Sequence, residues 1–484
     1  MLIYLNNHNY RYETENLCRA FFPNEKLEII NSDSYNEDIL PYIFTYADKS
    51  SVKAGICSAD GNLFIYDNTI NENDDAELRL EQCLYRALCD YTGISQPWGI
   101  LTGVRPIKLF RKLSDEKGAD FAKQYFKEEL FVSENKIKLA ALTESHERKI
   151  LNVSKDNSFS LYVSIPFCPT RCSYCSFVSQ SIKQAKKLIT PYLELLCDEI
   201  TQTAKIVKKL NLKLESIYIG GGTPTTLEAH ELTKLIGCIR KNFDLSACRE
   251  FTVEAGRPDT ITEEKLNAII NGGADRISIN PQTMNDDVLK EIGRKHSAQQ
   301  TVEAYNLARK VGFSHINTDV IAGLPTESFE SFKSTIDALI DLSPESITVH
   351  TLSMKRSSYL TADGMRLYKK DAEICSDMVE YSINRLLESG YHPYYLYRQS
   401  KMLGNLENTG WCKPSKDCYY NVFIMDETHS IIACGAGAVT KLKAKNGVIE
   451  RIFNFKYPYE YIDRYNEQIE RKGRIEEFYE QYKM

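Results

Sequence analysis

The sequence predicts an α/β protein whose central part is an open, partial barrel of six βα units. From Ser160 onward, short β-type segments and helical patterns alternate six times. Such alternation is typical of parallel strands joined by right-handed crossover helices. Six units are too few for the closed eight-stranded barrel. We therefore expect a TIM-like (βα)6 half-barrel with an N-terminal α+β domain before it and a C-terminal extension after it.

The first 155 residues predict the small α+β domain. Strand-type segments and one amphipathic helix precede a loop rich in glycine and proline, which another helix follows. The strands are expected at residues 1–5, 54–58 and 63–66, the helix at 76–88 and the loop at 97–106. A covering or docking module is the simplest role for this domain. A substrate gate that uses Trp98 and Arg105 is the alternative.

The next part, residues 156–392, predicts the half-barrel. The expected strands are Leu161–Ile165, Ser216–Ile219, Glu250–Glu254, Arg276–Asn280, His315–Ile321 and Ser346–Thr351. The expected helices lie at about 187–209, 228–243, 262–272, 285–292, 297–311 and 327–341. Residues 393–484 predict a region that covers the substrate and closes the barrel, and it ends in a charged helical tail.

The first expected strand leads directly into a loop that carries Cys168, Cys172 and Cys175. Thiolates are soft ligands, and ligands this close in sequence let one loop wrap a metal centre. A structural zinc site needs a fourth protein ligand, and so does a ferredoxin loop. Three thiols instead favour a 4Fe–4S cluster with one iron open to a small molecule. A purely structural zinc protein is the simple alternative.

Polar motifs lie at or beyond the ends of the later strands. A glycine run, Gly220–Gly222, follows the second strand, and such a run lets a ligand approach the backbone closely. Glu254 ends the third strand, Gln282 and Arg294 follow the fourth, and Asp319 lies in the fifth. Because barrel enzymes bind ligands at the carboxyl ends of their strands, this series predicts a binding site beside the cysteine loop.

The stretch Ser160–Phe177 resembles the cluster loop of the radical S-adenosylmethionine (SAM) superfamily. Its flanking residues Tyr162, Ile165-Pro-Phe and Phe177 narrow the resemblance to the oxygen-independent coproporphyrinogen III oxidase-like group. The segment Gly220–Thr225 is similar to the superfamily's GGE element, with Thr223 in place of the glutamate. Segments 97–106 and 397–408 extend the resemblance over nearly the whole chain, including the N-terminal domain.

The resemblance implies both cofactors and their ligands. Cys168, Cys172 and Cys175 would hold a 4Fe–4S cluster, and the amino and carboxylate groups of SAM would chelate its open iron. The residues implied to contact SAM are Tyr162, Tyr174, Gly222, Thr223, Glu254, Gln282, Arg294, Asp319 and Ser353.

The resemblance also implies a reaction. A radical derived from SAM would remove a β-hydrogen from a propionate of coproporphyrinogen III, and loss of CO2 and one electron would leave a vinyl group. Two rounds would give protoporphyrinogen IX. A donor such as ferredoxin or flavodoxin would reduce the cluster. Propionates need cationic partners, so we name Arg257, Arg356 and Arg398 as candidate clamps.

One position departs from the pattern of the established oxidases of this group. They carry a fourth cysteine two residues after the third, where this chain has Phe177. A sister branch that acts in haem delivery shares this Cys-x-Phe ending. Two alternatives follow: a haem-binding chaperone on the same fold, and a radical SAM enzyme with another substrate, including methyl transfer or haem degradation.

Composition narrows the possible partners and location. The net charge of −6 and the pI near 5.9 argue against nucleic acid as the main partner. The N-terminus shows no signal-peptide pattern, and no apolar run is long enough to span a bilayer. We therefore expect a cytoplasmic protein, with free thiols and a porphyrinogen or haem-type small molecule as its ligand.

Overall fold

The computed structural model describes residues 1–32, 34, 39–177, 179–355, 358–362, 369–399 and 401–482. The chain forms two compact units. Unit 1 comprises Met1–Glu144, Met365–Ser376 and Leu396–Glu407, and unit 2 comprises Ser145–Gly364, Asp377–Tyr395 and Asn408–Met484.

Unit 1 contains a five-stranded sheet with the strand order β2-β1-β3-β4-β5. The strands are β1 (Leu2–Asn6), β2 (Glu28–Asn31), β3 (Tyr42–Ala47), β4 (Ser51–Cys57) and β5 (Leu63–Thr69). The helices are α1 (Arg11–Phe21), α2 (Ala76–Thr92), α3 (Pro106–Lys117), α4 (Ala119–Glu128) and the first part of α5 (Glu134–Leu151). The predicted α+β character is confirmed, although the sequence reading did not identify α1, β2 and β3.

Unit 2 contains an eleven-stranded sheet, whose centre is the predicted half-barrel. Six consecutive parallel strands are β6 (Ser158–Ile165), β9 (Lys213–Gly221), β10 (Glu250–Glu254), β11 (Arg276–Ser278), β12 (Ile316–Ala322) and β13 (Ser346–Thr351). The helices between them are α6 (Ile182–Lys209), α7 (Ala229–Asn242), α8 (Glu263–Asn271), α9 (Asp286–Glu291), α10 (Ala298–Val311) and α11 (Phe329–Leu342). Every predicted strand and helix of this part is present, within a few residues.

Further strands extend the sheet at both edges, so the barrel stays open. Beyond β13 lie β15 (Asn408–Cys412), which is antiparallel, and β14 (His392–Tyr397); beyond β6 lie β16 (Ser430–Cys434), β17 (Val439–Lys443) and β18 (Ile449–Phe453). The remaining helices are α12 (Tyr359–Ala362), α13 (Lys369–Glu388), α14 (Tyr419–Asp426), α15 (Pro458–Asp463) and α16 (Tyr465–Gln481). No helix in the described ranges is long and apolar enough to cross a membrane.

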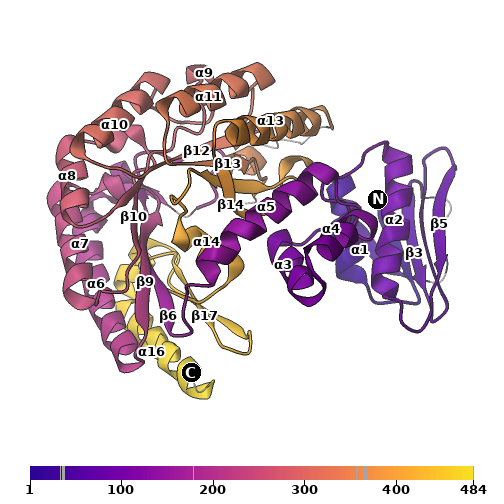
Figure 1. Cartoon of the computed structure of the whole chain (residues 1–484), viewed down its shortest axis with the longest axis horizontal. Helices are drawn as coiled ribbons and strands as arrows, with labels where there is room; N and C mark the ends of the chain where they lie inside the picture. The colour runs from indigo at the N-terminus through magenta and orange to yellow at the C-terminus, as the bar shows by residue number, and fades with distance from the viewer. Residues whose placement is uncertain are drawn as a thin grey trace. The chain divides into compact units, whose positions relative to one another are not determined.

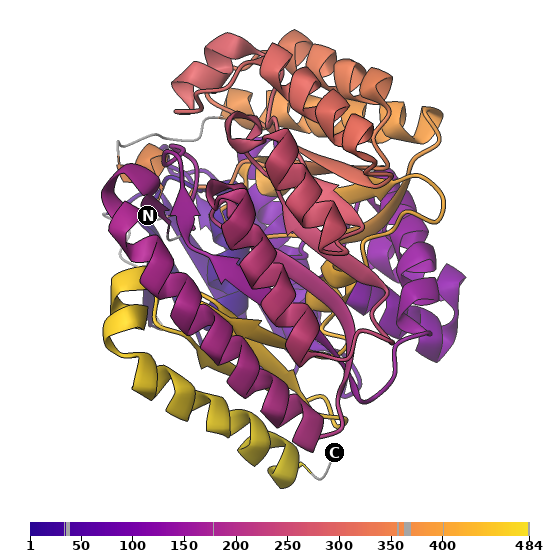
Figure 2. The same ribbon diagram turned by 90° about the vertical axis from the view of Figure 1, so that its left-hand side faces the viewer.

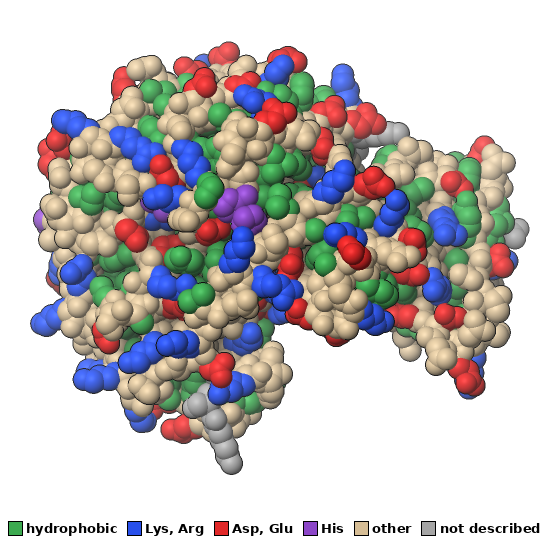
Figure 3. All heavy atoms as spheres, viewed as in Figure 1, with side chains coloured by type: hydrophobic (Ala, Val, Ile, Leu, Met, Phe, Trp, Pro, Cys, Tyr) green, Lys and Arg blue, Asp and Glu red, His purple; other side chains and the backbone are tan. Residues whose placement is uncertain are grey.

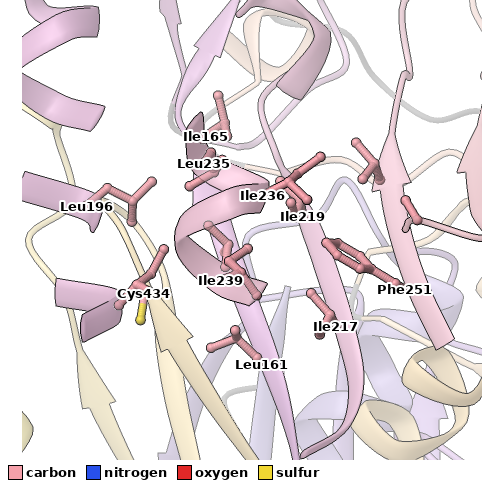
Figure 4. Close-up of a cluster of buried hydrophobic side chains, with 14 of the residues drawn as sticks. Leu161, Ile165, Leu196, Ile217, Ile219, Leu235, Ile236, Ile239, Phe251 and Cys434 are labelled. Atoms are coloured by element: carbon pink, nitrogen blue, oxygen red, sulfur yellow. The ribbon is translucent and has the colours of Figure 1, made fainter. Parts of the chain in front are cut away.

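The two faces of the parallel strands differ in chemistry because successive side chains point to opposite faces. Leu161, Ile217, Ile219 and Phe251 join residues of α6 and α7 in one buried apolar cluster, which Figure 4 shows. The helices α6, α7, α8 and α10 lie along the outside of these strands (Figure 1). The alternate residues, which face away from this cluster, are largely polar, and this second face carries the candidate site.

A buried ion pair ties the C-terminal helix to α6. Lys472 of α16 lies 2.9 Å from Glu199 of α6, and both side chains are at most 1% exposed. Glu199 also accepts hydrogen bonds from the Gly435 amide (2.7 Å) and the Tyr461 hydroxyl (2.6 Å). Figure 2 shows the two helices side by side. The full set of donors satisfies a carboxylate that burial would otherwise penalise.

We expect Lys472→Met to destabilise unit 2, because it leaves the Glu199 carboxylate buried without its counter-charge. Losing one partner of a buried pair costs roughly 3–5 kcal/mol of unfolding free energy, measurable by urea denaturation. The exposed pair Lys209–Glu476 joins the same two helices, so Lys209→Met is the matched control and should change stability little. Equal stability of the two variants would show that the buried pair contributes nothing beyond its packing.

Candidate active site

The cysteine loop leaves the carboxyl end of β6 and is held by backbone hydrogen bonds from two sides. On one side, the amides of Gly222 and Thr223 donate to the carbonyls of Ile165 (2.8 Å) and Phe167 (2.7 Å). On the other, the Ser173 amide donates to the carbonyl of Ile292 at 3.1 Å. The loop is therefore positioned by the glycine segment after β9 and by the segment after α9.

The three thiols lie close enough to influence one another. Burial raises the pKa of Cys168, and the neighbouring Cys172 adds to the shift. Burial also raises the pKa of Cys175 to about 11, with added repulsion from Cys172 and Cys168. None of the three forms a disulfide. Because ligand thiols must lose their protons, a cationic centre that binds here releases protons as it binds.

Hydrogen-bond donors surround these sulfurs. The Arg257 guanidinium lies 3.7 Å from the Cys172 sulfur, and the Thr223 hydroxyl lies 3.5 Å from the Cys168 sulfur. Arg257 is only 3% exposed, and Asp259 orients it through contacts of 3.0 and 3.1 Å. Positive charge and hydroxyl donors stabilise thiolates, so the surroundings suit an anionic sulfur cluster.

Gly222 packs against the cysteine loop so closely that a side chain there has no room. A Cβ at this position would lie 2.5 Å from the Phe167 carbonyl oxygen and 3.0 Å from the Cys168 sulfur. The bare backbone of glycine is therefore required beside the first cysteine. The three thiols and the donors around them fit a cluster held by three thiolates.

A carboxylate cluster lies on the polar face of the sheet and draws its residues from four of the parallel strands. The Tyr218 hydroxyl donates to Glu254 at 2.6 Å, and the Asn317 amide donates to Asp319 at 2.7 Å. His350 lies 3.8 Å from Asp319. These residues come from β9, β10, β12 and β13.

The two carboxyl groups of this cluster have different acidities. Burial raises the pKa of Glu254 to about 7, with a smaller contribution from the charge of Asp319. Burial also tends to raise the pKa of Asp319, but hydrogen bonding and charge from His350 lower it overall. At neutral pH Asp319 is therefore ionised, whereas Glu254 is close to its midpoint. A cationic ligand group beside Glu254 would favour its ionised form.

Gln282 and Arg294 continue the site from β11 and the segment beyond α9. Gln282 has a left-handed backbone (φ 71°), is 7% exposed and has no hydrogen-bond partner for Oε1 among the described residues. A buried amide oxygen without a donor is costly, so it is available to a ligand donor. Arg294 donates to the carbonyls of Asn280 (2.6 Å) and Gly256 (3.1 Å) and to the Tyr174 hydroxyl (3.3 Å).

The remaining predicted SAM contacts occupy different surroundings. Tyr174 lies in the cysteine loop against Arg294, whereas Tyr162 lies inside β6 and stacks near Tyr218 and Tyr420, with ring centroids 6.2 and 6.1 Å away. Ser353 is partly buried just beyond β13. The structure thus brings Tyr174, Gly222 and Thr223 to the cysteines, and Glu254 and Asp319 to one cluster, while Tyr162 belongs to an aromatic stack.

The three candidate substrate arginines lie in different settings. Arg257 contacts the cysteine loop, as described above. Arg398 belongs to unit 1, is 3% exposed and donates to the carbonyls of Leu101 and Asn405 (the latter at 3.0 Å). Arg356 lies outside the described residues.

The sequence analysis did not name three residues of the carboxylate cluster, Tyr218, Asn317 and His350. Tyr218 and His350 lie inside strands, where an aromatic residue or a histidine is usually taken for part of the hydrophobic core. The available signal was the two-residue period: Tyr218 and Glu254 share the polar face of adjacent strands, because Thr252 pairs with Tyr218. His350 likewise lies two residues beyond Thr348, which pairs with Asp319.

The chain is similar to several known proteins. Residues 162–339 match the model of the Radical SAM superfamily. The chain is 40% identical over 389 residues to the oxygen-independent coproporphyrinogen-III oxidase-like protein HemZ of Bacillus subtilis, covering 79% of this chain and 77% of the relative. It is 30% identical to the haem chaperone HemW of Lactococcus lactis, covering 59% of this chain and 71% of that protein.

Among solved structures, the chain resembles coproporphyrinogen III oxidase (HemN) from Escherichia coli, described as a radical SAM enzyme. The TM-score is 0.52 with 23% identity, over 66% of this chain and 72% of that one. At this identity the similarity is evidence for a shared fold alone, and that fold agrees with the predicted half-barrel.

We expect Gly222→Ala to reduce the iron and sulfide bound after anaerobic reconstitution, because the new methyl group would displace the Phe167 carbonyl or the Cys168 sulfur. Iron and acid-labile sulfide per chain are the measurements. Gly237→Ala, in helix α7 with open space around its Cβ, is the matched control. Full cluster content in both variants would mean that the loop relaxes at little cost.

Proposed function

The chain belongs to the oxygen-independent coproporphyrinogen-III oxidase-like family of radical SAM enzymes, and from this premise we propose that it decarboxylates coproporphyrinogen III to protoporphyrinogen IX without oxygen. The cofactors of the family are a 4Fe–4S cluster and SAM. The observation that carries the proposal is the three-thiol loop at the carboxyl end of β6, beside a cluster of carboxyl, amide and imidazole groups. The identity to HemZ supports the choice of substrate.

In the proposed arrangement, each polar group has a binding task. Cys168, Cys172 and Cys175 hold the cluster, while Gly222 and Thr223 lie beside Cys168, where the amino acid part of SAM would meet the backbone. When bound, the reduced cluster and SAM supply a carbon-centred radical that abstracts a hydrogen atom. Glu254 and Asp319 would accept from ammonium or ribose groups, and Gln282 would accept through its unpaired Oε1.

Two roles are proposed for the arginines, and Arg257 is a candidate for both. Arg294 and Arg257 already donate to protein acceptors around Tyr174 and Cys172, so we propose that they position the cysteine loop and stabilise its thiolates. A clamp for the substrate propionates stays a prediction for Arg257, Arg356 and Arg398. A reduced ferredoxin or flavodoxin would supply the electron for the cluster, and one electron would pass from the substrate to an acceptor.

A haem chaperone is the second candidate function. It is favoured by Phe177, which stands where established oxidases carry a fourth cysteine and which is 64% exposed. HemW proteins, described as haem chaperones, are also among the relatives. An exposed aromatic ring beside the cluster loop suits contact with a flat macrocycle.

Anaerobic turnover separates these functions. Reconstituted protein with dithionite, SAM and coproporphyrinogen III should yield protoporphyrinogen and matching amounts of 5′-deoxyadenosine. SAM cleavage without decarboxylation would retain a radical SAM enzyme and overturn the substrate. Stable haem binding without SAM cleavage would favour the chaperone.

We expect Cys172→Ala to abolish SAM cleavage, because the substitution removes one of the three thiolates that would hold the cluster. 5′-deoxyadenosine formed with dithionite alone is the measurement, since it needs no substrate. Cys89→Ala, which changes a partly buried free cysteine of unit 1, is the control and should retain cleavage. Cleavage by the Cys172 variant at the control rate would remove this residue from the cluster.

We expect SAM affinity to rise with pH up to about pH 7 and then level off. Below that value the Glu254 carboxyl is protonated in the free protein, so a cationic ligand must displace its proton, at a cost of up to about tenfold in affinity per pH unit. Calorimetric titration at several pH values measures this. Glu254→Gln should bind more weakly above pH 7 and show a flatter profile; an unchanged profile would place Glu254 away from the bound cation.

A further inference from the structure

A second cluster of metal-binding side chains lies in unit 2. His146 of α5, His392 of β14 and Asp417, which precedes α14, offer ligand atoms that all lie within 4.8 Å of one another. Figure 3 shows histidine side chains gathered at the surface in the region where Figure 1 places α5 and β14. The three residues come from segments far apart in the sequence.

The ligand atoms of this cluster are close enough to share one ion, and the two stacked rings must turn to point both nitrogen lone pairs at it. The two imidazole rings stack with their centroids 3.8 Å apart, and His392 Nε2 lies 3.2 Å from Asp417 Oδ1. Two ligands of a tetrahedral zinc ion, each about 2.1 Å from the metal, lie roughly 3.4 Å apart. In the part of the chain that the structure describes, no hydrogen bond occupies the His146 ring.

A thiol lies directly behind these three groups. The sulfur of Cys412, fully buried at the end of β15, lies 3.2 Å from His392 Nε2 and 3.5 Å from Asp417 Oδ1. His392 and Asp417 keep 14% and 18% of their side-chain surface exposed, so an ion can reach the site from solvent. Nitrogen, oxygen and sulfur donors together favour a borderline cation of the zinc type over Mg²⁺ or Ca²⁺.

This cluster is distinct from the active site because it lies at the opposite end of the sheet. Cys412 pairs with Ser346, the first residue of β13, and the Tyr419 amide after Asp417 donates to Glu250, the first residue of β10. The cysteine loop leaves the other end, after Ile165. An ion bound here therefore takes no part in the chemistry beside Cys168.

We propose that His146, His392 and Asp417 form a structural zinc-type site, with the Cys412 thiol beside them. The ion would join the end of α5 to β14 and to the segment before α14, which already contact one another through the His146–His392 stack and the His392–Asp417 pair. This proposal is independent of the substrate and of the radical chemistry.

Zinc titration of the cluster-loaded protein tests the site. Holoprotein is used so that Cys168, Cys172 and Cys175 are occupied, and a chromophoric chelator competes for Zn²⁺ under anaerobic conditions. We expect one zinc ion per chain, at least about tenfold weaker binding in His146→Ala and in Asp417→Asn, and unchanged iron content throughout. Zinc should also raise the thermal midpoint of the wild type more than that of either variant.

The matched control is His230→Ala, which removes an exposed histidine of α7 and should bind zinc like the wild type. Circular dichroism of each variant verifies folding, and Asp417→Asn, nearly isosteric, keeps the test valid if His146→Ala unfolds. Equal zinc binding by the wild type, His146→Ala and Asp417→Asn would overturn the site. No zinc uptake by the wild type would overturn it as well.

Discussion

The alternation of side chains along six parallel strands is the constraint on which this structure depends. Along β6, β10 and the part of β9 from Ser216 to Gly220, every second residue is apolar and packs beneath helices, and the residues between them are largely serine, tyrosine, threonine and glutamate. A shift of register by one residue would bury the polar set beneath the helices and expose the apolar set. The same pattern therefore fixes the helix layer and determines which groups reach the site.

A polar inner face is stable only if its groups find partners, and here they find one another across strands. Arg276 of β11 is almost fully buried and donates to Ser346 of β13 (2.9 Å) and to the His315 ring (3.1 Å). Ser160 and Ser216 share a hydrogen bond of 2.6 Å between β6 and β9. Such contacts offset desolvation and hold neighbouring strands in register.

Sequence reasoning succeeded where a repeating pattern or a close motif carried the information. All six barrel strands and the position of the cysteine loop were predictable, because period, order and spacing are local properties. The partners of Glu254 and Asp319 were not, because Tyr218 and His350 acquire their meaning only from the strand beside them. His146, His392 and Asp417 are still less accessible to such reasoning, since more than two hundred residues separate the first two. In the short strands β2 and β3, the alternation of apolar and polar residues is too weak to predict a strand.

Two glutamates of one strand show why position along the barrel decides function. Glu250 and Glu254 lie on the same face of β10, and burial raises the pKa of both. Glu250, at the amino end, accepts from the Cys418 thiol (3.1 Å) and the Tyr419 amide (2.7 Å), so the protein uses its lone pairs. Glu254, at the carboxyl end, has Tyr218 as its side-chain donor and remains partly exposed. Glu254 can still accept hydrogen bonds from a ligand beside the cysteine loop. The acceptor positions of Glu250 are already used by donors of the protein, so Glu250 stabilises the fold.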